Sequence, residues 1–177
     1  MKILILCASG NSDGYTYHMC QQFQSAVSSD GHDAELVELS DMCIEDCNGC
    51  CSCKSGKGCV IKDDMSAMYS VLGFVDMVVM ATPIRFSGPS SILKRFIDRL
   101  NPFWFSKADH PKFACAMMCG GSPEPKFTNA RSEMVSAANT VGMKWLGELC
   151  IGGTDEPINQ DERISLFAKE MVDLTRA

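Results

Sequence analysis

Short apolar runs recur along the chain, and polar or amphipathic segments separate them. The runs Lys2–Cys7 and Phe113–Cys119 are continuously hydrophobic and are followed by small residues and glycine, which predicts strands buried on both faces. Residues 74–81 form a similar run, and residues 145–151 predict a fifth strand. Residues 34–39 alternate aliphatic side chains with acids, as expected of a strand nearer the sheet edge. Strands of this kind favour a parallel sheet.

Helical spacing fills the segments between these runs. Met19, Phe23 and Ala26 recur on one helix face, and Gly31 lies where a left-handed cap would end that helix. The same amphipathic pattern predicts helices from about residue 63, from about residue 89, over residues 131–141 and around residues 164–171. Alternating strands and helices, joined by right-handed crossovers, predict a three-layer α/β domain with a doubly wound, five-stranded parallel sheet. We expect residues 1–177 to form this single domain.

Composition narrows the class of protein. A formal net charge of −6 has the wrong sign for a protein held mainly by phosphate backbones, so we expect no nucleic-acid partner. No apolar run approaches the roughly 20 residues of a membrane helix, and the first apolar run is too short for a signal peptide. The chain has eleven cysteines, several of them inside apolar segments, which favours a reducing, cytoplasmic location without a membrane partner.

The loop over residues 9–16 follows the first predicted strand and precedes a helix. Ligands of open parallel sheets bind at the carboxyl ends of the strands, so this is a place to look for a site. The loop contains hydroxyls, an amide and two glycines, which suit an anion such as phosphate at a helix start. An ordinary polar turn with a helix cap explains the same residues equally well. The loop matches neither the dinucleotide nor the triphosphate glycine pattern.

Two further loops follow predicted strands. In residues 82–89, Pro83 stiffens a loop whose backbone donors suit the edge of a planar ring, and Phe86 offers an apolar face. Gly120 and Gly121 would let the main chain approach a ligand closely. Each loop alone is consistent with a plain turn, but the three together favour a ligand site.

The chain resembles the flavodoxin-like NAD(P)H-dependent FMN reductases, and especially their cysteine-rich branch, the iron–sulfur flavoproteins. The similarity runs through residues 8–16, 59–65, 82–86 and 93–99 and covers roughly the first 100 residues. In the family, a loop of the pattern Gly-Ser-Pro-Arg-x-x-Gly-Asn-Thr holds the FMN phosphate. This chain departs from that pattern at Gly10, Asn11 and Tyr15, which removes an arginine that would bind phosphate.

The resemblance implies a flavodoxin-like fold and a set of FMN-binding residues. The phosphate would lie on Ser9, Asn11, Gly14, Tyr15 and Thr16, and the ring against Pro83, Ile84, Arg85, Phe86, Gly120 and Gly121. Reduction places negative charge near N1 and the C2 carbonyl of the ring, so a nearby cation stabilises the reduced form. Arg85 is the candidate for this tuning role, and the alternative is a surface arginine paired with an acid.

Residues 41–62 contain six cysteines and no hydrophobic period, and such a long connection is typically functional. Cys47, Cys50, Cys53 and Cys59 follow one another at gaps of two, two and five residues, which lets their thiolates turn toward one point as in ferredoxins. The family resemblance implies a [4Fe–4S] cluster on these four. We expect the side chain of Cys51 to point away. The alternatives are zinc, which usually uses two more distant cysteine pairs, and an empty or disulfide-forming loop.

The preferred interpretation is an FMN-dependent oxidoreductase that takes electrons from NAD(P)H or a ferredoxin-type donor. FMN, with or without the cluster, would pass them to a small-molecule or protein partner. The alternatives are a flavodoxin-like electron carrier and a zinc or thiol redox sensor. Phe103, Trp104 and Phe105 suggest an apolar patch that suits a homodimer or tetramer, and anchoring of a loop explains them equally well. His18 is expected on a helix surface. Small core side chains are expected at Cys7, Cys20, Cys115, Cys119 and Cys150.

Overall fold

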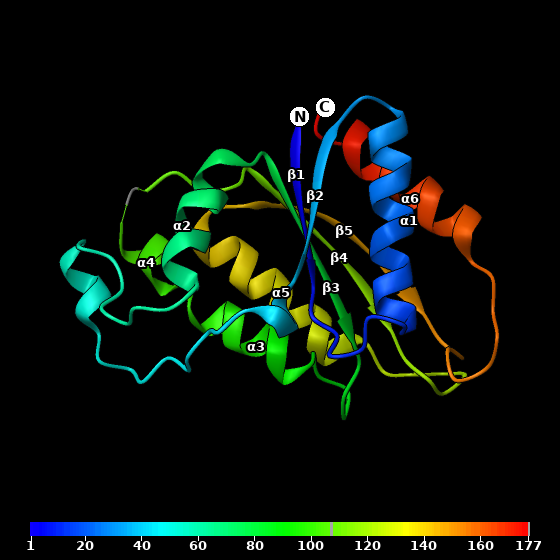
Figure 1. Cartoon of the computed structure of the whole chain (residues 1–177), viewed down its shortest axis with the longest axis horizontal. Helices are drawn as coiled ribbons and strands as arrows, with labels where there is room; N and C mark the ends of the chain where they lie inside the picture. Colours follow the sequence, from blue (N-terminus) through cyan, green and yellow to red (C-terminus); the bar gives the residue numbers. More distant parts are fainter. Residues whose placement is uncertain (107, 177) are drawn as a thin grey trace.

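The computed structural model describes residues 1–106 and 108–176. Within them the strands form one parallel five-stranded sheet in the order β2-β1-β3-β4-β5, which is the flavodoxin-like order (Figure 1). The strands are β1 (Lys2–Cys7), β2 (Asp33–Glu38), β3 (Met77–Pro83), β4 (Phe113–Cys119) and β5 (Lys144–Ile151). This confirms the predicted fold class.

Helices cover both faces of the sheet (Figure 1). They are α1 (Tyr15–Ser29), α2 (Met65–Phe74), α3 (Ser91–Asp98), α4 (Asn101–Phe105), α5 (Thr128–Val141) and α6 (Asp161–Asp173), with short 3-10 helices η1 (Leu39–Asp41) and η2 (Ser52–Ser55). Alternate side chains of β1 enter two separate cores, because successive residues of a strand point to opposite faces. Ile3 and Ile5 pack with α1 and α6, whereas Leu4 and Leu6 pack with α2, α3 and α5.

The structure corrects four details of the sequence-based assignment. The strand predicted over residues 74–81 begins only at Met77, because Phe74 ends α2 and is 78% exposed. Helix α4 was not predicted. The expected apolar patch is reduced, since Phe103 is buried against Tyr69, while Trp104 is 57% exposed. Cys150 is only half-buried and is not a full core residue.

The chain reverses its direction of winding at β1, because β2 and β3 pair with opposite edges of that strand. The loops after β1 and β3 therefore open side by side. Ser90 joins them: its hydroxyl donates to the Ala8 carbonyl at 2.7 Å, and its N–H donates to the Thr82 hydroxyl at 3.0 Å. Ser90 also caps α3 by accepting from the Leu93 N–H. This buried junction fixes the start of α3 beside the first loop.

No helix in the described part of the chain combines the length and the apolar character that crossing a bilayer requires.

Candidate functional site

The loop after β1 is folded on itself and leads directly into α1. The Asn11 N–H donates to the Ser9 hydroxyl at 3.2 Å, and the Gly14 N–H donates to the Asn11 carbonyl at 3.1 Å. Gly14 is the N-cap of α1 and brings no side chain to cap the helix. Since the first N–H groups of a helix have no intrahelical acceptor, this end of α1 offers donors to an anion.

Tyr15 and Thr16 begin α1 with two polar groups that lie inside the protein. The Tyr15 hydroxyl is buried and has no hydrogen-bond partner among the described residues. Burial and the nearby Asp161 carboxylate raise the pKa of Tyr15, so its hydroxyl keeps its proton at neutral pH. Thr16 is 3% exposed and its hydroxyl contacts the Cys119 sulfur. A buried donor without a partner next to an uncapped helix start fits a phosphate group.

The loops after β3 and β4 enclose a cavity of about 420 Å³. The residues proposed for the flavin ring that line it are Ile84, Arg85, Phe86, Gly120 and Gly121. Backbone hydrogen bonds of 2.9 Å in both directions between Arg85 and Gly88 close a tight turn. Phe86 and Ser87 at its tip have φ of 50° and 66°, and the Phe86 side chain is fully exposed. The turn therefore holds Arg85 at the cavity and presents an aromatic face to solvent.

The two glycines after β4 lie close to other side chains of the protein. A Cβ on Gly121 would lie 2.2 Å from the Asp155 carboxylate, and one on Gly120 would lie 2.6 Å from Pro125. The Ile84 N–H is a backbone donor of the loop after β3, but it donates to the Cys119 carbonyl at 2.7 Å and is not free for a ring. The loop after β4 is thus a rigid cavity wall, and its glycines do not serve ligand approach alone.

The cysteine-rich loop of residues 41–62 is closed at its base by backbone and carboxylate contacts. The Cys43 N–H donates to the Asp64 carboxylate at 2.7 Å, and the Asp64 N–H returns a bond of 3.1 Å to the Cys43 carbonyl. The Glu45 N–H donates to the Asp63 carboxylate at 2.8 Å. The loop extends from this base beside α4, on the side of the sheet away from α1 and α6 (Figure 1).

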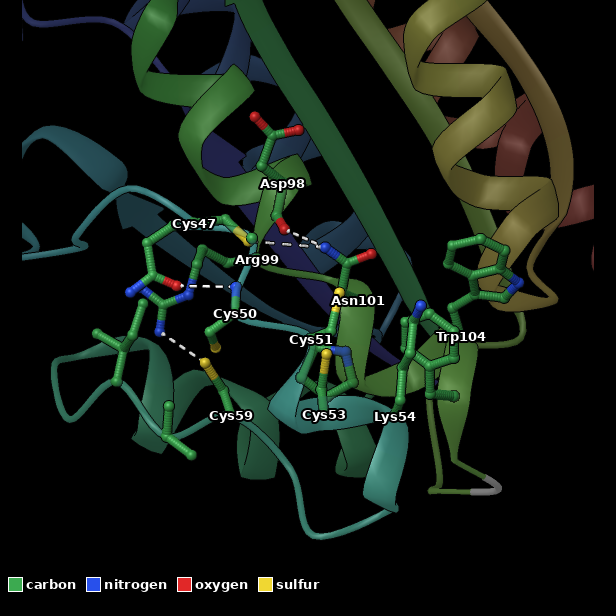
Figure 2. Close-up of a pocket in the computed structure, with 16 residues that line it drawn as sticks. Cys47, Cys50, Cys51, Cys53, Lys54, Cys59, Asp98, Arg99, Asn101 and Trp104 are labelled. Atoms are coloured by element: carbon green, nitrogen blue, oxygen red, sulfur yellow. Dashed lines mark hydrogen bonds between the residues drawn. The ribbon is translucent and has the colours of Figure 1, made fainter.

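The four predicted ligands line one cavity of about 290 Å³ (Figure 2). They are Cys47, Cys50, Cys53 and Cys59. Cys51 lines the same cavity with φ of 58°, so its exclusion from the ligand set stays a prediction. Trp104 and Phe105 stack at 4.6 Å beside it, and the Lys54 ammonium lies 5.6 Å from the Phe105 ring centre. This last contact holds η2 against α4.

The four thiols supply donors that either an iron–sulfur cluster or a zinc ion uses. In residues 1–106 and 108–176, no three His, Cys, Asp or Glu side chains converge closely enough to hold one metal ion. A zinc ion draws four sulfurs to about 2.3 Å from one centre, whereas a cubane binds each thiolate at a different corner. Burial raises the pKa of the Cys53 thiol, and the nearby Cys59, Cys47 and Cys50 raise it further. Four thiols along one cavity supply the donor set that a [4Fe–4S] cluster uses.

Sequence reasoning missed the residues that support these sites. Arg99 and Asn101 touch cysteine sulfurs, and Cys119 touches Thr16. An arginine on an amphipathic helix looks like a surface residue, and contacts across such long sequence separations leave no local pattern. His18 lies 2.7 Å from Asp161 and joins α1 to α6, as a half-exposed helix residue can.

The fold and these two sites define a flavodoxin-like protein with a cysteine-rich insertion. Residues 1–152 match the model of the family described as NADPH-dependent FMN reductase, and the chain belongs to that family. An iron-sulfur flavoprotein of Methanocaldococcus jannaschii is 27% identical over 122 residues, which are 69% of this chain and 63% of that protein. An iron-sulfur flavoprotein of Archaeoglobus fulgidus is 33% identical over 99 residues, which are 56% of this chain and 48% of that protein. The matches thus span about half to under two thirds of these relatives.

Solved structures share the fold at low sequence identity. An NAD(P)H:quinone oxidoreductase from Methanothermobacter marburgensis superimposes with a TM-score of 0.76 at 20% identity, covering 98% of this chain and 96% of that one. A flavone reductase gives a TM-score of 0.75 at 20% identity, covering 97% of this chain and 60% of that one.

Proposed function

We propose that the protein is an FMN-dependent oxidoreductase with a [4Fe–4S] cluster on Cys47, Cys50, Cys53 and Cys59. It would take electrons from NAD(P)H or a ferredoxin-type donor and deliver them to a small-molecule or protein acceptor. The observation that carries the proposal is that the two ends of helix α3 contact the segments proposed for the two sites. Ser90 at the start of α3 is bonded to the loop after β1, and Arg99 just past its end contacts Cys59. At about 1.5 Å per residue, Ser90 and Arg99 are roughly 13 Å apart.

The chain supplies FMN with an anion site and a wall for its ring. The uncapped start of α1, the Tyr15 hydroxyl and the loop of residues 9–14 would hold the phosphate. The cavity between the loops after β3 and β4 would hold the ring, with the exposed Arg85 as a positive charge on its rim. When bound, FMN supplies both hydride acceptance and single-electron transfer, and the protein orients and tunes it. A cation near the ring stabilises the charge that reduction adds.

Membership of the reductase family favours this function over an electron carrier or a zinc or thiol sensor. Iron-sulfur flavoproteins among the relatives support the cluster. A homodimer or tetramer is part of the proposal, and the exposed side chain of Trp104 supports it as apolar surface for a second copy. The cytoplasmic location stays a prediction from the eleven cysteines.

Anaerobic titration of the full chain with NADPH and NADH tests the proposed activity. The flavin released from the purified protein is first identified by chromatography, with FMN expected because the loop after β1 has no dinucleotide pattern. We expect one of the two nicotinamides alone to bleach the visible flavin absorbance rapidly. FAD as the main flavin would refute the site assignment. Bleaching that requires an added reductase or ferredoxin would leave an electron carrier as the function.

A further inference from the structure

A buried ion pair lies at the base of the cysteine-rich loop. Arg99 is 1% exposed and Asp63 is 3% exposed at the side chain. The two Arg99 terminal nitrogens donate to the two Asp63 oxygens at 2.5 and 3.0 Å, the planar two-bond geometry that orients a guanidinium most firmly. One of these nitrogens also donates to the Glu45 carbonyl at 2.7 Å. Arg99 therefore ties both ends of the cysteine-rich loop to the end of α3.

Two side chains beyond the end of α3 reach cysteine sulfurs (Figure 2). The Arg99 Nη2 lies 3.7 Å from the Cys59 sulfur, and the Asn101 Nδ2 lies 3.8 Å from the Cys47 sulfur. Cys47 and Cys59 are the first and last of the four predicted ligands. The Asn101 amide also donates to the Asp98 carbonyl at 2.9 Å, which fixes its direction. One short segment thus supplies a donor to each end of the motif.

Donors beside ligand sulfurs affect both the fit and the potential of a metal centre. They orient the ligand, and they stabilise the negative charge that builds up on the sulfurs when a cluster is reduced. Burial of an arginine is costly unless it is fully paired, and the Arg99 Nε–H is buried without a partner among the described residues. Anchoring the loop alone would not require so costly a residue. Asp63 orients the guanidinium, and an oriented guanidinium keeps one N–H directed at Cys59.

We propose that Arg99 and Asn101 are positioning residues for the iron–sulfur cluster. They hold the first and last cysteines at their places in the cavity before metal arrives, and they raise the reduction potential of the loaded cluster. The proposal rests on the cluster assigned under the proposed function. Asp63 belongs to the same unit because it orients Arg99.

The test on the loaded protein uses Asn101→Ala and Arg99→Lys, with Asn139→Ala on the exposed side of α5 as the matched control. Lysine keeps the charge of Arg99 but loses the two-bond geometry and the donor to sulfur. Anaerobic dye titration measures the cluster potential, and iron release to a chelator measures retention. We expect a lower potential and about tenfold faster iron release in both variants, with FMN content unchanged. Potentials and release rates equal to those of the control would overturn the proposal.

The test on metal-free full chain separates this proposal from the cluster assignment. Lys54, Lys57 and Lys62 make the loop a substrate for limited trypsin cleavage. We expect Arg99→Lys and Asp63→Asn to be cut there several times faster than wild type, while Asn139→Ala matches wild type. If the wild-type protein contains no iron when it is purified anaerobically, the cluster assignment is refuted. The difference in cleavage rate would still test whether Arg99 and Asp63 anchor the loop. Equal cleavage in all variants would refute the anchor even in a protein that binds iron. Should Arg99→Lys fail to fold, Asn101→Ala still decides the role toward sulfur.

Discussion

The hydroxyl of Thr16 lies 3.1 Å from the sulfur of Cys119, and both residues are 3% exposed. This contact joins the first turn of α1 to the end of β4 across 103 residues of sequence. Burial raises the pKa of the Cys119 thiol, although hydrogen bonds with Thr16 and Thr154 offset part of the effect, so the thiol is protonated at neutral pH. A protonated thiol can donate to the Thr16 oxygen, which leaves the hydroxyl proton of Thr16 for an anion.

Thr16→Ala is expected to weaken FMN binding by about ten- to a hundredfold, because a hydrogen bond to a charged phosphate contributes about 1.5–3 kcal/mol. Saturating FMN should restore most of the activity. Thr16→Ser keeps the hydroxyl and is the matched control, and Cys119→Ala should weaken binding by a smaller factor. Quenching of FMN fluorescence measures each dissociation constant. An unchanged constant in Thr16→Ala would place the phosphate elsewhere.

Asp63→Asn is expected to lower the free energy of unfolding by about 3–5 kcal/mol, because it leaves the buried Arg99 without its counter-ion. The matched control is Asp173→Asn, which breaks an exposed ion pair with Arg176 and should cost less than about 1 kcal/mol. Guanidinium unfolding of the metal-free chain measures both changes. Equal losses in the two variants would mean that the buried pair does not anchor the fold.

The same pair predicts how stability depends on pH. Burial alone would raise the pKa of the Asp63 carboxyl, but hydrogen bonds from Arg99 and from the Glu45 and Met65 N–H groups hold it below its usual range. A lowered folded-state pKa stabilises the protein above the unfolded value of about 3.9, and this contribution disappears as the pH falls through the folded value. Wild type should therefore lose more stability than Asp63→Asn on acidification below about pH 4. If the free energy of unfolding falls in parallel in the two proteins as the pH is lowered, the lowered pKa assigned to Asp63 is contradicted.

Gly152→Ala should destabilise the fold by about 1–3 kcal/mol, because its Cβ would lie 2.6 Å from the Pro123 carbonyl oxygen, which belongs to the backbone. Gly10→Ala is the matched control in the loop after β1, where the nearest atom beyond its neighbours is a methyl of Ile92 at 3.7 Å. Gly10→Ala should change the free energy of unfolding only slightly. Thermal unfolding compares the two. If Gly152→Ala unfolds at the wild-type temperature, the loops after β4 and β5 are less tightly packed than described.

The sheet could be predicted well wherever a strand is buried on both faces. Lys2–Cys7 and Phe113–Cys119 match at both ends, because each apolar run stops at residues that suit a loop. The predicted start of β3 was wrong, because Phe74 extends the apolar run although it belongs to the end of α2. Short apolar runs do not distinguish a helix end from a strand.

The candidate sites were only partly predictable. Regular gaps between the cysteines revealed the four candidate ligands, and the structure brings them to one cavity. The residues that contact these ligands could not be predicted, because Arg99 contacts Asp63 and Cys59 only in the tertiary fold. Cys119 looked like core packing, and nothing near it in the sequence points to Thr16. Local patterns show which groups are available, whereas contacts between distant residues decide what each one touches.

The most direct test of the account is the iron and acid-labile sulfide content of anaerobically purified protein. Wild type should contain both in amounts near four per chain, as a [4Fe–4S] cluster requires. Cys47→Ala, Cys50→Ala, Cys53→Ala and Cys59→Ala should each lose them while keeping FMN. Cys51→Ala, the matched control from the same cavity, should retain iron and sulfide at the wild-type level. Wild type without iron, or equal loss in the Cys51 variant, would contradict the proposed cluster and its ligands.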